Sequence, residues 1–255
     1  MTIRALITGA TGFIGRRLAS RLATEGFVIT SLQRPRDEVR GVHETIALTS
    51  FTPASIADAL RSRQFDCLFH LASYGVNPGH RDLGEMFRIN VDVTRALVEL
   101  AAGWPKGCVV ISGSGAEYDL THATTPVSEF QPLESFKSYG ASKAAGGLVA
   151  LATARATNLP LAYLRLFGVF GPGEARIGDV VAGPHLVAEA RVVGHVVDPD
   201  VGAVGIAHSR RPVRVNHPPV GVLNAQGLGR VVRGARVDRD LGVADRARVA
   251  GAVRE

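Results

Sequence analysis

Three glycines near the start of the chain, Gly9, Gly12 and Gly15, constrain its fold more than any other feature. They follow an apolar, β-forming run over residues 3–8 and precede a helical pattern over residues 13–23. In that context the first glycine permits a tight turn, and the second lets the backbone approach a pyrophosphate. The third lets the helix pack closely on the strand, and the helix start offers unpaired N–H groups to phosphates. The sequence therefore predicts a strand–turn–helix unit that binds a dinucleotide.

The rest of the first 174 residues alternates between short apolar runs and longer segments with helical spacing. Strands are expected at residues 3–8, 27–32, 45–48, 67–72, 108–112 and 161–166, and helices at residues 13–23, 53–63, 83–102 and 136–157. Such alternation indicates βαβ units joined by right-handed crossovers. The expected fold class is therefore α/β, a doubly wound parallel sheet whose ligand lies at the carboxyl ends of the strands.

A tyrosine and a lysine share one face of the last expected helix. Tyr139 and Lys143 are four residues apart, so their Cβ atoms would lie about 5–6 Å from each other. A free phenol has a pKa near ~10, which is too high for a base at neutral pH. Because a neighbouring ammonium favours the phenolate, the pair is suited to exchanging a proton with a hydroxyl group.

Five segments occur in the order that is typical of one enzyme family. They cover residues 8–15, 70–72, 89–94, 139–143 and 164–173. Together they resemble the extended short-chain dehydrogenase/reductase family, the NAD-dependent epimerases and dehydratases that modify nucleotide-linked sugars. The resemblance implies a Rossmann-type NAD(P)-binding domain at residues 1–174, followed in the family by a sugar-binding lobe.

The resemblance also implies roles for individual residues. In the catalytic trio, Ser114 holds the substrate oxygen, Tyr139 exchanges the hydroxyl proton and Lys143 reaches the nicotinamide ribose. The implied cofactor-binding residues are Gly9, Thr11, Gly12, Phe13, Ile14, Gly15, Arg34, Leu71, Ala72, Asn90, Tyr139, Lys143 and Phe167. No metal ligand is implied. His70 is expected to be a hydrogen-bonded core histidine, and Glu117 a solvated or salt-bridged carboxylate.

Some positions depart from the family's pattern. Dehydratases carry Asp-Glu after the serine, where this chain has Gly115 and Ala116, so elimination of water is not expected. NAD-specific members end the second strand with an acid, where this chain has Gln33 followed by Arg34. A guanidinium suits a 2′-phosphate, so NADP is slightly favoured over NAD, although Arg34 could equally be a solvated loop arginine. Many epimerases have asparagine in place of Gly168, which leaves that substrate contact open.

The leading hypothesis is an NAD(P)-dependent epimerase or 4-ketoreductase that acts on a nucleotide-activated (deoxy)sugar by hydride transfer. An epimerase would hold its cofactor tightly with no net oxidation, whereas a reductase would release oxidised cofactor. A non-catalytic relative would lack the trio, which is present. The alternative is a truncated or frameshifted, catalytically impaired NAD(P)-binding relative.

Residues 175–255 differ in composition from the rest. They contain no aromatic residue, Met, Cys, Lys or Thr, but 19 Val, 12 Arg, 12 Ala and 11 Gly. A sugar-binding lobe should carry aromatics that stack on rings, so this segment is expected to be an atypical or incomplete substrate lobe. Because a G/C-rich gene read out of frame yields such a mixture, one hypothesis is a frameshift close to residue 174. The rival hypothesis is a genuinely divergent lobe.

Composition argues against several other classes. The net charge of +6 is spread along the chain without a basic cluster, so nucleic-acid binding is not expected. The chain shows no signal-peptide pattern and no apolar run of roughly 18 residues, so no membrane span is expected. Cys67 and Cys108 are interpreted as reduced core residues of a cytoplasmic protein. The expected partner is a nucleotide sugar, and a homodimer is left open.

Overall fold

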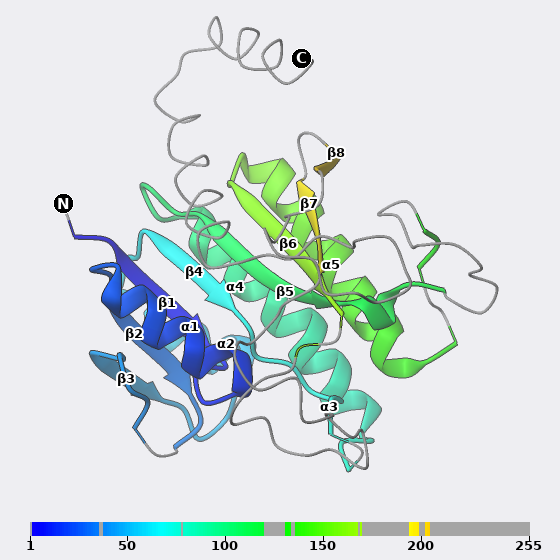
Figure 1. The fold of residues 1–255 in the computed structure, drawn as a ribbon, viewed down its shortest axis with the longest axis horizontal. Coiled ribbons are helices and arrows are strands. Elements are labelled where there is room, and N and C mark those ends of the chain that lie inside the picture. Colours follow the sequence, from blue (N-terminus) through cyan, green and yellow to red (C-terminus); the bar gives the residue numbers. More distant parts are fainter. Residues whose placement is uncertain are drawn as a thin grey trace, which may run out of the picture.

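The computed structural model describes residues 2–35, 38–77, 79–119, 131–133, 136–167 and 169, and the backbone of residues 194–198 and 202–204 (Figure 1). The elements are β1 (Arg4–Thr8), α1 (Phe13–Thr24), β2 (Val28–Gln33), β3 (Glu44–Ala47), α2 (Pro53–Leu60), β4 (Cys67–His70), α3 (Leu83–Phe87), η1 (Arg88–Val93), α4 (Thr94–Ala102), β5 (Val109–Ser114), η2 (Gly115–Glu117), α5 (Ser138–Thr157), β6 (Leu161–Leu166), β7 (Gly194–Asp198) and β8 (Gly202–Val204). Every expected strand and helical segment is present, with bounds that differ by a few residues.

The strands form one sheet in the order β3-β2-β1-β4-β5-β6-β7-β8, and the pairs from β3 to β6 are parallel. The chain winds outward from β1 to β3 and then returns to continue from β4 on the other side of β1. Thr8 at the end of β1 lies beside both Leu32 of β2 and His70 of β4. The carboxyl ends of these strands therefore meet at one edge, as the predicted doubly wound, Rossmann-type sheet requires.

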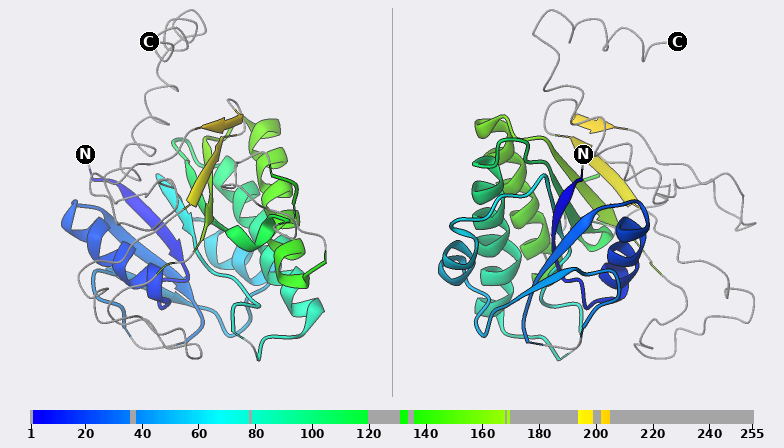
Figure 2. Two further views of the ribbon diagram at one scale, coloured as in Figure 1. Left: turned by 45° about the vertical axis from the view of Figure 1, so that its right-hand side comes forward. Right: turned by 90° about the vertical axis from the view of Figure 1, so that its left-hand side faces the viewer.

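Helices cover both faces of the sheet (Figure 2). On one face α1 packs its apolar side, including Leu18 and Leu22, against β1 and β4. On the other face α2, α4 and α5 enclose the larger part of the core. Burial on both faces explains why the strands are apolar runs rather than alternating patterns. Cys67 and Cys108 lie buried on this sheet, with their Sγ atoms 2.9 Å apart.

The helix expected over residues 83–102 is present without a break, but it is not α-helical throughout. It consists of α3, the π-helical turn η1 and α4. The Thr94 hydroxyl donates a hydrogen bond to the Asn90 carbonyl at 2.8 Å, which competes with the helical ladder. A Cβ atom at Gly146 of α5 would overlap the same carbonyl oxygen. The widened turn thus lies in close contact with α5, and such turns are frequent at functional sites.

Beyond β6, the sheet continues with β7 and β8, which pair antiparallel (Figure 1). The rest of residues 175–255, and Gly168, lie outside the described residues. Among the described helices, none is long and apolar enough to cross a membrane. Within the same part of the chain, no group of three or more His, Cys, Asp or Glu side chains could hold a metal ion.

Candidate active site

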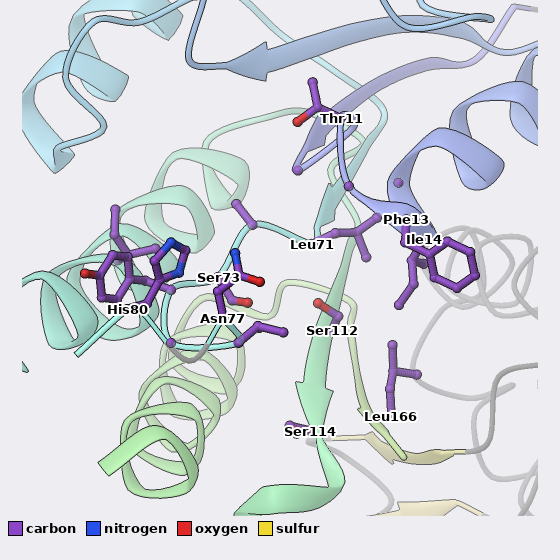
Figure 3. A pocket seen from close by; sticks show the side chains of 18 of the residues that line it. Thr11, Phe13, Ile14, Leu71, Ser73, Asn77, His80, Ser112, Ser114 and Leu166 are labelled. Carbon is purple, nitrogen blue, oxygen red and sulfur yellow. The ribbon is translucent and has the colours of Figure 1, made fainter. Parts of the chain in front are cut away.

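The carboxyl ends of β1, β2, β4, β5 and β6 surround a cavity of about 740 Å³ (Figure 3). Of the expected site residues, all but Asn90 and Lys143 line it. Those that do are Gly9, Thr11, Gly12, Phe13, Ile14, Gly15, Arg34, Leu71, Ala72, Ser114, Tyr139 and Phe167. The topology therefore brings residues from far apart in the chain to one surface.

Each of the three glycines of the first turn lies in a different structural setting. Gly9 has a φ of +74°, and a Cβ there would lie 2.7 Å from the Ala72 nitrogen. A Cβ at Gly15 would overlap the Gly9 carbonyl oxygen, so α1 packs directly on the turn. At Gly12 the nearest described atom to a Cβ would be that same oxygen, at 3.3 Å, and the residue faces the cavity. The protein's own packing thus limits Gly12 at one tight contact only, and the helix start beside it is the kind of place that binds phosphates.

Tyr139, in the first turn of α5, is the centre of a group of hydroxyls. Its side chain is hydrogen-bonded to Ser114, at the end of β5, and to Ser73, which follows β4. Burial raises the pKa of Tyr139, and the two hydrogen bonds lower it by less. The net direction is opposite to the lowering expected from a neighbouring ammonium, because removal from water disfavours the phenolate.

Ser73 is a site residue that sequence reasoning missed. It lines the cavity beside Leu71 and Ala72, which were expected to contact the cofactor (Figure 3). Its place at the carboxyl end of a central strand was the available signal, since such positions face the ligand in doubly wound sheets.

Lys143 lies one helical turn beyond Tyr139 but does not line the cavity. It is buried, and its Nζ donates a hydrogen bond to the Ser112 carbonyl at 2.7 Å. Burial lowers the pKa of Lys143, and the charge of Glu117 raises it by less. Its contact with a nicotinamide ribose remains a prediction.

Asn90 also lies behind the cavity wall. Its Oδ1 accepts from the Tyr74 N–H at 2.9 Å, and its Nδ2 donates to the Tyr74 carbonyl at 2.8 Å. The same Nδ2 lies 2.9 Å from the Ser142 hydroxyl of α5. Asn90 therefore ties the segment after β4 to α5 and supports the cavity from outside.

His70 is the hydrogen-bonded core histidine that the sequence indicates. Its Nδ1 lies 2.7 Å from the Thr8 hydroxyl, and its Nε2 lies 3.0 Å from the Thr94 hydroxyl. Because Thr94 gives its proton to Asn90, we assign the ring proton to Nε2, with Nδ1 accepting from Thr8. Burial, aided by the Lys143 ammonium, lowers the pKa of His70 to about 3, so the ring is neutral.

The end of β2 carries the two residues that bear on cofactor choice. Gln33 is buried and accepts a hydrogen bond from the Ser31 hydroxyl at 3.0 Å. Arg34 is half-exposed and forms an ion pair with Glu85 of α3, with Nη2 and Oε1 3.2 Å apart. It lines the cavity, and its contact with a cofactor remains a prediction. Exposed ion pairs of this kind contribute only about 0–1 kcal/mol to stability.

Glu117 is fully buried and pairs with Arg165, with Oε2 and Nε 2.8 Å apart. Of the two roles expected for this carboxylate, the salt-bridged one is confirmed and the solvated one is wrong. Glu117 is buried because it ends the short turn η2 directly after β5. From there its side chain reaches Arg165 of the neighbouring strand β6.

Comparisons with known proteins agree with this geometry. Residues 5–195 match the model of the NAD dependent epimerase/dehydratase family. The chain is 28% identical over 187 residues to dTDP-6-deoxy-L-talose 4-dehydrogenase (NAD(P)(+)) of Kitasatospora kifunensis, which covers 70% of this chain and 57% of that protein. It is 31% identical over 205 residues to UDP-glucose 4-epimerase of Mycolicibacterium smegmatis, covering 75% and 64%.

Solved structures show the same similarity. MoeE5 in complex with UDP-glucose and NAD has a TM-score of 0.57 and 31% identity, covering 68% of this chain and 56% of that one. Pal from Bacillus thuringiensis, at 22% identity and a TM-score of 0.61, shares the fold. The chain spans less than two thirds of the length of these relatives. The family match extends over most of the sequence and includes the glycine turn and the Tyr139 helix, so the chain belongs to the NAD dependent epimerase/dehydratase family.

Proposed function

We propose that the chain is an NAD(P)-dependent epimerase or 4-ketoreductase of a nucleotide-activated (deoxy)sugar. The observation that carries the proposal is that the hydrogen-bonded Ser114 and Tyr139 side chains line the same cavity as the glycine turn. The activities of two relatives, a 4-dehydrogenase acting on a deoxysugar and a 4-epimerase, support this substrate class.

Residues around the cavity would hold the dinucleotide. The turn from Gly9 to Gly15 would bind the pyrophosphate, and the Leu71–Ala72 backbone would line its path. Arg34 would lie near the adenosine ribose, where it could receive a 2′-phosphate. When bound, the nicotinamide supplies the acceptor or donor of a hydride.

Tyr139 would exchange the proton that accompanies the hydride. In the oxidative direction it takes the proton of the sugar hydroxyl, and in the reductive direction it gives a proton to the carbonyl oxygen. The Ser114 hydroxyl would hold that same oxygen. Because burial raises its pKa, Tyr139 is protonated at neutral pH, which suits proton donation during reduction.

Dinucleotide binding is the first test. The folded chain should show a thermal shift with NAD or NADP. With UDP-glucose or a dTDP-6-deoxyhexose as substrate, an epimerase should convert the sugar without net oxidation. A reductase acting on the 4-keto form should release oxidised cofactor, which the absorbance of the nicotinamide follows. A folded chain that binds neither dinucleotide would refute the proposal.

The role of Tyr139 has its own test. Tyr139→Phe should lower turnover by about 10²–10⁴-fold while leaving dinucleotide affinity nearly unchanged, because only the exchangeable proton is lost. Ser73→Ala is the comparison variant, since it removes one hydrogen bond from the same phenol but keeps the exchangeable proton, and it should therefore cost much less turnover. Retention of more than about a tenth of the activity by Tyr139→Phe would contradict the assignment.

The alternative function is a catalytically impaired NAD(P)-binding relative. The composition of residues 175–255 favours it, because a sugar pocket needs side chains that this segment lacks. Dinucleotide binding without turnover of any nucleotide sugar would be the result that selects this alternative.

A further inference from the structure

A buried ionic network lies beside the proposed active site. At its centre is Glu117, which has no exposed surface. One carboxylate oxygen, Oε1, accepts from the Ser114 N–H at 2.6 Å and from the Tyr163 hydroxyl at 2.8 Å. The other, Oε2, accepts from Arg165 Nε at 2.8 Å, and Arg165 also donates to the Tyr118 hydroxyl at 3.1 Å. Both carboxylate oxygens thus have charge-assisted partners, which a buried charge requires.

The network forms hydrogen bonds to the main chains of two members of the trio, Ser114 and Lys143. Glu117 accepts the N–H of Ser114, while the Ser114 hydroxyl accepts the Ala116 N–H at 3.2 Å, so the turn is closed from both sides. The Tyr163 hydroxyl also lies 3.0 Å from the Lys143 carbonyl of α5, and it has one proton to share between that oxygen and Glu117. The carboxylate therefore links the end of β5 to the helix that carries Tyr139 and Lys143.

Two glycines make room for this link. A Cβ at Gly113 of β5 would overlap the Tyr163 ring and lie 2.6 Å from Glu117 Oε1. A Cβ at Gly147 of α5 would lie 2.6 Å from Tyr163 Cζ. The Tyr163 ring thus lies between β5 and α5 and is in close contact with both. Interiors are packed too closely for the spacing between β5 and α5 to change without moving the helix.

The charge of Glu117 also acts on the proposed site. It raises the pKa of Lys143 against the effect of burial, and it raises the pKa of Tyr139. A residue that only filled space would influence neither group.

We propose that Glu117 is a positioning residue that holds Ser114 and α5 in register through Tyr163, and thereby maintains the contact between the Ser114 and Tyr139 side chains. The inference rests on the proposed function, because it assigns Glu117 a part in that site. It is not a catalytic residue, since its oxygens face the protein interior and it does not line the cavity.

The test compares two nearly isosteric variants. Glu117→Gln keeps the shape and an acceptor oxygen but removes the charge. Tyr163→Phe keeps the ring and the ion pair but removes the bridging hydroxyl. The phenolate fraction of Tyr139 is measured by ultraviolet absorbance against pH, as the difference between each protein and the same protein carrying Tyr139→Phe. The titration stops at the highest pH at which circular dichroism shows all the proteins folded, and phenolate fractions are compared there.

The two variants should move the titration in opposite directions. Glu117→Gln should increase the phenolate fraction, because a negative charge near the phenolate is lost. Tyr163→Phe should decrease it, because a loosened Ser114 no longer stabilises the phenolate by hydrogen bonding. Ser114→Ala is the reference for the second direction. If folded Tyr163→Phe titrates like the wild type, the proposal is overturned, whatever Glu117→Gln does, because the shift of Glu117→Gln reports the lost charge and not the position of Ser114.

The proposal can also be tested if Glu117→Gln does not fold, or by kinetics if the enzyme is active. If Glu117→Gln does not fold, Tyr163→Phe alone decides, and its titration must shift in the direction of Ser114→Ala. With an active enzyme, Tyr163→Phe should lower kcat by about tenfold or more with KM and dinucleotide affinity nearly unchanged. The titration of Tyr139 needs neither substrate nor cofactor. A chain without turnover would therefore refute the proposed function, while the titration would still decide whether Glu117 positions Ser114.

Discussion

Replacing Gly12 with valine should strongly weaken dinucleotide binding while leaving the chain folded. Gly12 is the N-cap of α1 with a φ of −75° and a ψ of 171°, a conformation open to any residue. Among the described atoms, a Cβ would approach the Gly9 carbonyl oxygen most closely, at 3.3 Å. Valine is a poor N-cap, so the variant should lose about 1 kcal/mol of stability. For a chain of this size that lowers Tm by about 2–4 °C.

The effect on binding should be much larger. The valine side chain would stand on the cavity wall where the pyrophosphate has to approach the backbone. Loss of two hydrogen bonds to a charged phosphate costs about 1.5–3 kcal/mol each. At about 1.4 kcal/mol per factor of ten, binding should weaken at least about a hundredfold.

Isothermal titration calorimetry with NAD and NADP measures the affinity, and thermal unfolding measures the stability. Gly15→Ala is the matched control, because its Cβ would overlap the Gly9 carbonyl oxygen between two rigid elements. That variant should lose about 3 kcal/mol of stability whether or not a ligand is present. Wild-type affinity in Gly12→Val, or a loss of stability as large as that of Gly15→Ala, would refute the assignment of the turn.

Three other predictions concern the cofactor, acid stability and the C-terminal segment. Arg34→Ala should weaken NADP binding and leave NAD binding nearly unchanged; equal affinities of the wild type and the variant for NADP would overturn the NADP preference. Stability should fall as the pH drops below 6.5, because unfolded His70 takes up a proton that the folded ring, with a pKa of about 3, does not bind. The loss is about 1.4 kcal/mol per pH unit, or about 2 kcal/mol by about pH 5, and His70→Gln should remove that part of the slope in urea unfolding; an unchanged slope would count against it. Translation of the coding DNA in the other two frames downstream of Gly173, continued past residue 195 where the family match ends, should yield an aromatic-containing sugar-binding lobe; if neither frame does, residues 175–255 are genuine.

Local features of the sequence were sufficient for the order of the elements and for the glycine turn that lines the cavity. The glycine turn could be predicted because its demands are set within a few residues: a positive φ at Gly9 and close helix packing at Gly15. The order of strands and helices was equally accessible, since apolar runs and helical spacing are local patterns. The neighbouring positions of Tyr139 and Lys143 on one helix face follow from four-residue spacing alone.

Only the tertiary structure decided what surrounds those residues. The contact of Ser73 with Tyr139, and the link from Glu117 through Tyr163 to α5, join residues whose separation along the chain has no fixed relation to their distance in space. The direction of the Tyr139 pKa likewise depends on burial, which outweighs the nearby charge that the sequence displays. Helical spacing also did not predict the π-helical turn at Asn90, whose carbonyl accepts from the Thr94 hydroxyl and lies against Gly146 of another helix. The sequence by itself determined which elements form and which groups they carry, because those depend on local backbone preference; packing between distant elements determined how the groups are paired, buried and charged.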